Sequence, residues 1–291
     1  MTRCSRRSRR SRRFARPATL LAALTATAAL AAGCSVVSSS SRAIAPTAMA
    51  VSMPDVQAVG VEVSSVNGRI VITQDPSFGD AVVSAEARLT STERAERFSI
   101  ETVMQDGVLR VRPLWPDGKK LNNESCNIEI TAPQIVDVDA RTSNGSVRLS
   151  GGTGTTVIKS SNGSVTIKDR SGNLTARTSN GRIVVEGGSG PLDVASSNGS
   201  ITIKHFGPGG DAPYQWRAAT SNGSIRVELP ESPSGRVRAS TSNSKVRVFR
   251  KESSGAQTEL LASRSIDLEL GSGASDIVLS TSNGSIVVVT P

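Results

Sequence analysis

Four copies of one phrase decide the fold of this chain: Ser143-Asn144-Gly145, Ser161-Asn162-Gly163, Ser179-Asn180-Gly181 and Ser197-Asn198-Gly199. Their asparagines lie 18 residues apart three times in succession. The phrase returns at Asn222 and Asn283, as Ser-Asn-Ser at Asn243, and in an earlier form at Asn67. A repeat of fixed period is typical of a solenoid, in which each repeat packs on the one before it.

Apolar residues recur at fixed distances from these asparagines. The positions three and five residues after each asparagine are apolar, and those four and six residues before it are small or apolar in nearly every copy. Because alternate residues of a strand face the same side, these positions form one buried face. The pattern predicts an all-β fold, a parallel β-solenoid with coils of about 18 residues, each divided into two or three short strands. Right-handed winding is expected from the general preference of parallel connections.

Two other folds compete with this prediction. Asn-Gly between alternating strands is a strong hairpin signal, which would favour an antiparallel meander. A meander does not require like residues to lie side by side, whereas here even the Thr or Ser two residues before each Asn is reproduced. Eighteen residues are also three hexapeptides, the period of left-handed β-helices, but the sequence shows no six-residue repeat.

The repeated Asn and Gly are predicted to form structural corners. Glycine after the asparagine would allow positive φ at a tight turn, and stacked asparagines would form an inward ladder of amide hydrogen bonds. The predicted corner residues are Asn67, Asn144, Gly145, Asn162, Gly163, Asn180, Gly181, Asn198, Gly199, Asn222, Gly223, Asn283 and Gly284.

The first 58 residues indicate export. Residues 1–33 contain a basic region, a short apolar region and small residues before Cys34, which together predict a secretory signal. Ala-Ala-Gly-Cys at 31–34 resembles the lipobox of bacterial lipoproteins, which implies lipidation of Cys34 and anchoring to a membrane. Ala31 departs from the usual Leu or Val, so ordinary secretion into the periplasm or medium is the alternative. Residues 34–58 are rich in Ser, Ala and Pro and are predicted to be a flexible tether.

The charge of the chain belongs mostly to this signal. The formal net charge is +9, and residues 1–33 hold eight arginines and no acid, so the remainder carries +1. A nucleic-acid partner is therefore not expected.

The rest of the chain divides into two parts. Residues 59–132 form an irregular β lead-in, with a helical turn near 92–98 and a hairpin around Gln105-Asp106-Gly107. Residues 133–291 form the regular repeats, and Ser265–Leu270 is expected to supply a coil that lacks Asn-Gly. The apolar segment Ser285–Pro291 is expected to be the open end of the solenoid, where copies of the chain could self-associate.

The signal, the lead-in and the iterated Thr-Ser-Asn-Gly-x-Ile-x-Val together resemble the bacterial putative-adhesin family of uncharacterised β-helical envelope proteins. The resemblance covers residues 59–291. It implies a β-solenoid outside the cytoplasm and brings no catalytic residues.

Catalytic and metal-binding patterns are weak. His205 is the single histidine, and no nucleophile motif accompanies it. Asp137, Asp139 and Asp193 could belong to a polysaccharide-acting site, but they read as scattered surface charges. Gly187-Gly188-Ser189-Gly190 begins like a calcium repeat, yet Leu192 stands where that repeat needs Asp. We therefore expect no enzyme activity, no metal and no cofactor.

Three basic residues offer a surface for contact. Arg141, Lys159 and Arg177 occupy the same position in successive repeats and would form an outward stripe suited to a glycan or an envelope protein. The sequence thus predicts a non-catalytic, lipid-anchored cell-envelope protein with an adhesive or structural role. A polysaccharide-acting enzyme and an envelope assembly or regulatory component are the alternatives.

Overall fold

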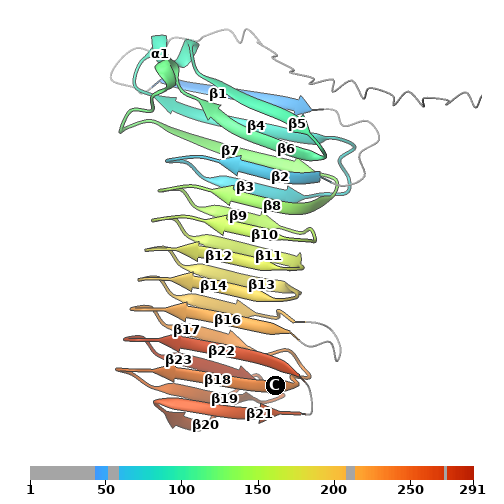
Figure 1. The fold of residues 1–291 in the computed structure, drawn as a ribbon, viewed down its shortest axis with the longest axis vertical. Coiled ribbons are helices and arrows are strands. Elements are labelled where there is room, and N and C mark those ends of the chain that lie inside the picture. The colour runs from blue at the N-terminus through green and yellow to red at the C-terminus, as the bar shows by residue number, and fades with distance from the viewer. Residues whose placement is uncertain (1–42, 52–58, 208–213, 272–273) are drawn as a thin grey trace, which may run out of the picture.

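The chain forms a long stack of β-strands arranged in two facing sheets (Figure 1). The computed structural model describes residues 43–51, 59–207, 214–271 and 274–291. The predicted signal, Cys34 and the first part of the predicted tether lie outside the described residues. The prediction of an all-β protein is confirmed, since a five-residue helix, α1 (Thr92–Glu96), and a short 3-10 turn, η1 (Pro116–Gly118), are the helical elements of the described ranges.

The first sheet has 12 strands. In stack order they are β1 (Ala43–Val51), β4 (Ala81–Leu89), β7 (Ser125–Ala132), β3 (Ile70–Gln74), β9 (Val147–Ser150), β11 (Val165–Ser171), β13 (Ile183–Ser189), β15 (Ile201–Lys204), β17 (Ile225–Glu228), β23 (Ile286–Thr290), β19 (Val246–Lys251) and β20 (Gln257–Ser263).

The second sheet has 11 strands. From the same end they are β5 (Ser99–Gln105), β6 (Val108–Leu114), β2 (Val59–Ser64), β8 (Ile135–Arg141), β10 (Thr156–Lys159), β12 (Leu174–Thr178), β14 (Leu192–Ser196), β16 (Gln215–Thr220), β22 (Ser275–Thr281), β18 (Gly235–Thr241) and β21 (Ser265–Leu270).

The Ser-Asn-Gly corner joins a strand of the second sheet to a strand of the first. The chain passes through β10, the corner at Asn162, then β11, and returns to β12 beside β10. Pairing between successive repeats is parallel, and Val147, Val165, Ile183 and Ile201 are consecutive partners. Identical columns therefore stack, and the apolar positions predicted from the sequence are buried between the sheets.

The order of the strands departs from the order of the chain at both ends of the stack. Strand β3 pairs with β9, while the lead-in strand β7 lies on its other side. Strand β23 lies between β17 and β19. The prediction for Ser285–Pro291 is thus wrong: β23 lies within the stack, because its edges pair with two parallel neighbours.

Antiparallel strands close both ends of the stack. The predicted hairpin at 105–107 is confirmed, since β5 pairs antiparallel with β6, and β4 pairs antiparallel with β7. At the far end, β20 pairs antiparallel with β19, and β21 with β18. The prediction of a parallel coil at Ser265–Leu270 is therefore wrong, because this segment folds back along β18 as an end strand.

The prediction that residues 34–58 form a flexible tether is wrong for one segment, which forms strand β1. Ala43–Val51 lies within 34–58 and pairs antiparallel with β4, from Ala43 opposite Leu89 to Val51 opposite Ala81. The open edge of β4 offers unpaired backbone groups, and a passing segment that pairs with them satisfies both strands.

Close backbone stacking explains the corner glycines. A β-carbon added to Gly181 would lie 1.9 Å from the carbonyl oxygen of Gly163, and one added to Gly163 would lie 1.6 Å from that of Gly145. The predicted positive φ is wrong for these glycines, since positive φ occurs instead at glycines of the opposite corner such as Gly172 and Gly188. The Asn-Gly corner requires glycine because any side chain would overlap the preceding repeat.

We predict that Gly181→Ala strongly destabilises the protein. The new methyl group would overlap backbone atoms of Gly163 and force neighbouring repeats apart, with an expected cost of about 3 kcal/mol or more. Urea unfolding followed by circular dichroism measures this cost. Gly79→Ala is the control, because its added β-carbon meets no atom within 4 Å, and its midpoint should stay near that of the native chain. Equal midpoints for the two variants would contradict the stacking argument.

Candidate functional site

A ladder of asparagine side chains runs along one edge of the stack. The Nδ2 of Asn180 donates to the Oδ1 of Asn162 at 2.6 Å, and the Nδ2 of Asn198 donates to the Oδ1 of Asn180 at 2.7 Å. The series begins at Asn67 and continues through Asn144, Asn162, Asn180, Asn198, Asn222, Asn283 and Asn243. The predicted ladder is present, but the prediction that it points inward is wrong, since most of these side chains are exposed.

A second ladder of hydroxyl groups lies inside the same corner. The buried Oγ1 of Thr178 accepts from the backbone N–H of Gly181 and donates to the carbonyl oxygen of Gly163 at 3.1 Å. Equivalent bonds are made by Ser196 and Thr220. The buried hydroxyl, and not the exposed amide, satisfies the backbone groups that the turn would leave unpaired.

The opposite corner holds a buried arginine that the sequence analysis missed. Arg170 is 1 % exposed; its Nε donates to the Oγ1 of Thr156 at 2.7 Å and one terminal nitrogen donates to the carbonyl of Val136 at 2.6 Å. Burial lowers the pKa of Arg170 to about 10. The one available signal was Thr156, a polar residue in an otherwise apolar column, which the arginine uses as an acceptor.

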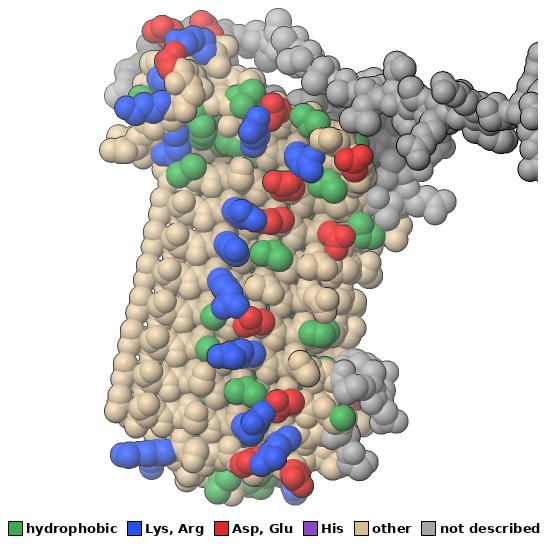
Figure 2. All heavy atoms as spheres, viewed as in Figure 1, with side chains coloured by type: hydrophobic (Ala, Val, Ile, Leu, Met, Phe, Trp, Pro, Cys, Tyr) green, Lys and Arg blue, Asp and Glu red, His purple; other side chains and the backbone are tan. Residues whose placement is uncertain are grey.

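The predicted basic stripe is present but is partly neutralised. Lys159 lies in register between Arg141 and Arg177, on the outer face of the 11-stranded sheet. Arg141 binds both oxygens of Asp139, and Arg177 binds Asp193 at 2.5 Å. Figure 2 shows basic side chains in a column down one broad face, with acidic side chains beside many of them. Repulsion between these like charges is therefore a weaker reason to expect a partner on this face, because Asp139 and Asp193 already neutralise two of the three basic residues.

The acidic residues considered for catalysis are likewise bound to neighbouring groups. Asp139 and Asp193 each hold an arginine, and Asp137 accepts from the backbone N–H of Thr155 at 2.6 Å. A shallow hollow of about 430 Å³ has Asp193 and Asp276 in its lining, but Asp276 is also held, by Arg238 at 2.6 Å. Each of these carboxylates is thus engaged by a guanidinium group or a backbone N–H, and the two acids of the hollow are not a free pair.

The remaining reactive residues stand apart from one another. His205 is exposed at the end of β15, and Cys126 is a buried free thiol whose pKa burial raises to about 12. In the described ranges, no three His, Cys, Asp or Glu side chains gather in a way that could hold a metal ion.

The two ends of the stack differ in how they cover the core. At the end near β1, Glu124 is buried against Arg94, with 2.6 Å between Oε1 and Nε, and this bond lowers the pKa of Glu124 to about 2. Phe98 and Trp115 pack there with ring centroids 5.1 Å apart. This end of the core is plugged by aromatic rings and a buried ion pair.

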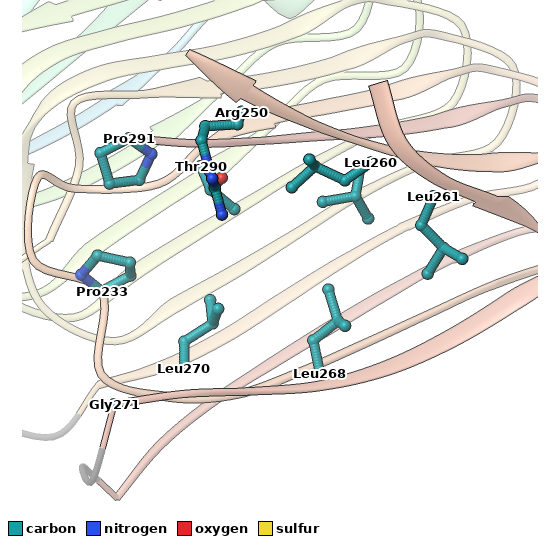
Figure 3. A pocket seen from close by; sticks show the side chains of 10 residues that line it. Pro233, Arg250, Leu260, Leu261, Leu268, Leu270, Gly271, Thr290 and Pro291 are labelled. Atoms are coloured by element: carbon teal, nitrogen blue, oxygen red, sulfur yellow. The ribbon is translucent and has the colours of Figure 1, made fainter. Parts of the chain in front are cut away.

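The opposite end, between β20 and β21, remains open as an apolar groove. Figure 3 shows Leu260 and Leu261 on one side of the groove and Leu268 and Leu270 on the other. The groove has a volume of about 390 Å³, and Leu260 and Leu261 are 49 % and 40 % exposed. Sequence reasoning missed this surface because it placed the open end at Ser285–Pro291.

The profile of one protein family, Toastrack DUF4097, matches residues 24–288. This chain belongs to the Toastrack DUF4097 family. No curated protein matches the sequence.

The Toastrack chain is also similar to solved structures at low sequence identity. A putative cell adhesion protein from Clostridium sporogenes is 11 % identical, over 86 % of this chain and 100 % of that one, with a TM-score of 0.35. A putative adhesin from Bacteroides fragilis is 14 % identical, over 85 % and 98 %, with a TM-score of 0.42. A putative lipid binding protein from Parabacteroides distasonis is 14 % identical, over 85 % and 97 %, with a TM-score of 0.36.

Within the part of the chain that the structure describes, no helix has the length and apolar character needed to cross a membrane.

We predict that the buried hydroxyl matters more for stability than the exposed amide. Thr178→Val removes the partner of two buried backbone groups and should cost about 2–3 kcal/mol. Asn180→Ala removes two exposed hydrogen bonds and should cost about 1 kcal/mol, enough to lower the melting temperature by a few degrees. Denaturant unfolding of both variants tests the order, and a larger loss for Asn180→Ala would contradict it.

Proposed function

We propose that this Toastrack protein is an exported, lipid-anchored component of the bacterial cell envelope that acts as a non-catalytic binding platform. In this proposal residues 1–33 are a signal peptide, Cys34 carries the lipid, and the body from 59 onward is a parallel β-solenoid with right-handed coils of about 18 residues. An adhesive or structural contact with an envelope protein or glycan is the role that follows.

One observation supports this proposal: the open apolar groove lies at the end of the stack opposite β1, the first strand that the structure describes. Strand β1, which follows the proposed anchor, lies at one end of the 12-stranded sheet, and β20 lies at the other. With neighbouring strands about 4.8 Å apart, the two are separated by roughly 50 Å. An anchored stack would hold the groove well away from its own membrane, where it could meet another surface.

The alternatives have less support. A polysaccharide-acting enzyme needs carboxylates that converge and can exchange protons, and the acids on the outer faces are bound by arginines. An envelope assembly or regulatory component stays compatible with the geometry, and the identity of neighbouring genes would discriminate it from an adhesin.

We predict that the expressed protein incorporates labelled palmitate and that Cys34→Ser abolishes the label. Cys126→Ser serves as the control, because its thiol is buried and should not affect labelling. Label that persists in Cys34→Ser would overturn lipidation at Cys34, and label that is absent from all three proteins would overturn the lipid anchor and favour a freely secreted or periplasmic protein.

We also propose that the open end self-associates with a second copy of this chain. Among the described strands, β20 and β21 each pair on one edge only. A two-fold axis that runs along the strands, midway between the two sheets, would place β20 of one copy antiparallel to β21 of the other.

We expect the native chain to form dimers and Leu260→Lys to be monomeric in light scattering. A lysine at this position would bury a charge in the apolar interface. Val66→Lys is the matched control, because Val66 is 42 % exposed on a corner far from the groove, and this variant should still dimerise. A native chain that stays monomeric at its highest soluble concentration would refute self-association.

A further inference from the structure

A second hollow lies on the outer face of the 12-stranded sheet, beside the last asparagine of the ladder. It has a volume of about 760 Å³, and three basic side chains, Lys245, Arg247 and Arg264, line it. Its other lining residues are small, polar or apolar, and none is Asp or Glu. The hollow therefore gathers three positive charges, with no carboxylate among its described lining residues.

The antiparallel end strand brings these charges together. Val246 pairs with Ser263 and Arg247 with Ala262, so the same register extended by one residue sets Lys245 opposite Arg264. Backbone bonds hold both residues, since Thr241 donates to the carbonyl of Arg264 at 2.9 Å and Ile286 donates to that of Lys245 at 3.1 Å. Like charges directly opposite on paired strands are destabilising unless an anion lies between them.

The lack of counterions distinguishes this cluster from the opposite face. There Arg141, Arg177 and Arg238 each bind a carboxylate. Among the described residues, by contrast, neither Lys245 nor Arg247 nor Arg264 makes an ion pair. The position of Lys245 is Ser in most copies of the repeat. Among the described repeats, only this one has an antiparallel strand that sets a basic residue opposite that position.

We propose that this hollow binds a phosphate group. Two guanidinium groups and one ammonium group suit an anion with several oxygens and more than one charge better than they suit a single carboxylate. The Oδ1 of Asn243, which ends the ladder, can accept from a hydroxyl of the phosphate-bearing molecule.

The phosphate could be carried by a lipid headgroup or by a soluble phosphate or phosphodiester polymer. This inference deepens the proposed function and rests on it for the biological setting, since it names the chemistry that the far end of the platform would recognise. The binding chemistry itself does not depend on the lipid anchor.

The test is displacement of a fluorescent polyphosphate from the full chain purified from cells, followed by anisotropy. Lys245→Gln combined with Arg264→Gln should weaken binding of the probe by about ten-fold or more, because two of three charged donors are lost. Arg148→Gln combined with Arg182→Gln is the matched control: it removes two positive charges from the outer face of the same sheet, away from both the hollow and the apolar groove. Its affinity should change by less than about three-fold, as expected for general electrostatic attraction.

Competitors then identify the source of the phosphate. Displacement of the probe by phosphatidylglycerol vesicles, but not by phosphatidylcholine vesicles, would assign the site to an anionic lipid headgroup. Displacement by inorganic phosphate without an effect of vesicles would assign it to a soluble ligand. Equal weakening in the two double variants, or no binding by the native chain, would overturn the phosphate site, whereas the palmitate experiment decides the anchor independently.

Discussion

The fold depends on one steric constraint, the approach of each corner glycine to the carbonyl oxygen of the glycine in the preceding repeat. At the closest of these contacts an added β-carbon would lie 1.6 Å from that oxygen, so only glycine permits it. The hydroxyl two residues before the asparagine then bridges the two corners, and the strands on either side fall into parallel register. Burial of the apolar columns follows from this register, because each strand presents the same face as its neighbour.

A stack of parallel strands has two ends, and each end exposes unpaired strand edges. The chain closes the ends by folding back antiparallel strands, so that parallel pairing stops at β7 and β6 on one side and at β19 and β18 on the other. The two closures are unequal. Aromatic rings and the Glu124–Arg94 pair cover one end of the core, while the other is left with exposed leucines.

The basic residues are also distributed unequally, since some are neutralised by carboxylates and others are not. Ion pairs within a strand and between neighbouring strands neutralise Arg141, Arg177 and Arg238 on the outer face of the 11-stranded sheet. The uncompensated cluster lies instead where β20 turns back beside β19, next to the apolar groove. The apolar groove and the unneutralised basic residues thus lie at the same end of the molecule, far from β1, which supports a role in which that end makes the contact.

The sequence by itself determined the repeat, the buried columns and the positions of the corners, because an 18-residue period of Asn-Gly and alternating apolar residues admits few other packings. It could not determine that β23 lies between β17 and β19 or that Ser265–Leu270 folds back, since strand order depends on which edges remain open after the repeats stack. It also gave the wrong reason for the corner glycines and the wrong direction for the asparagines. A positive φ and a close backbone contact both select glycine, so the sequence does not distinguish between them. The groove and the basic hollow were decided by tertiary structure alone, as each is formed by residues from segments whose adjacency arises only when the end strands fold back.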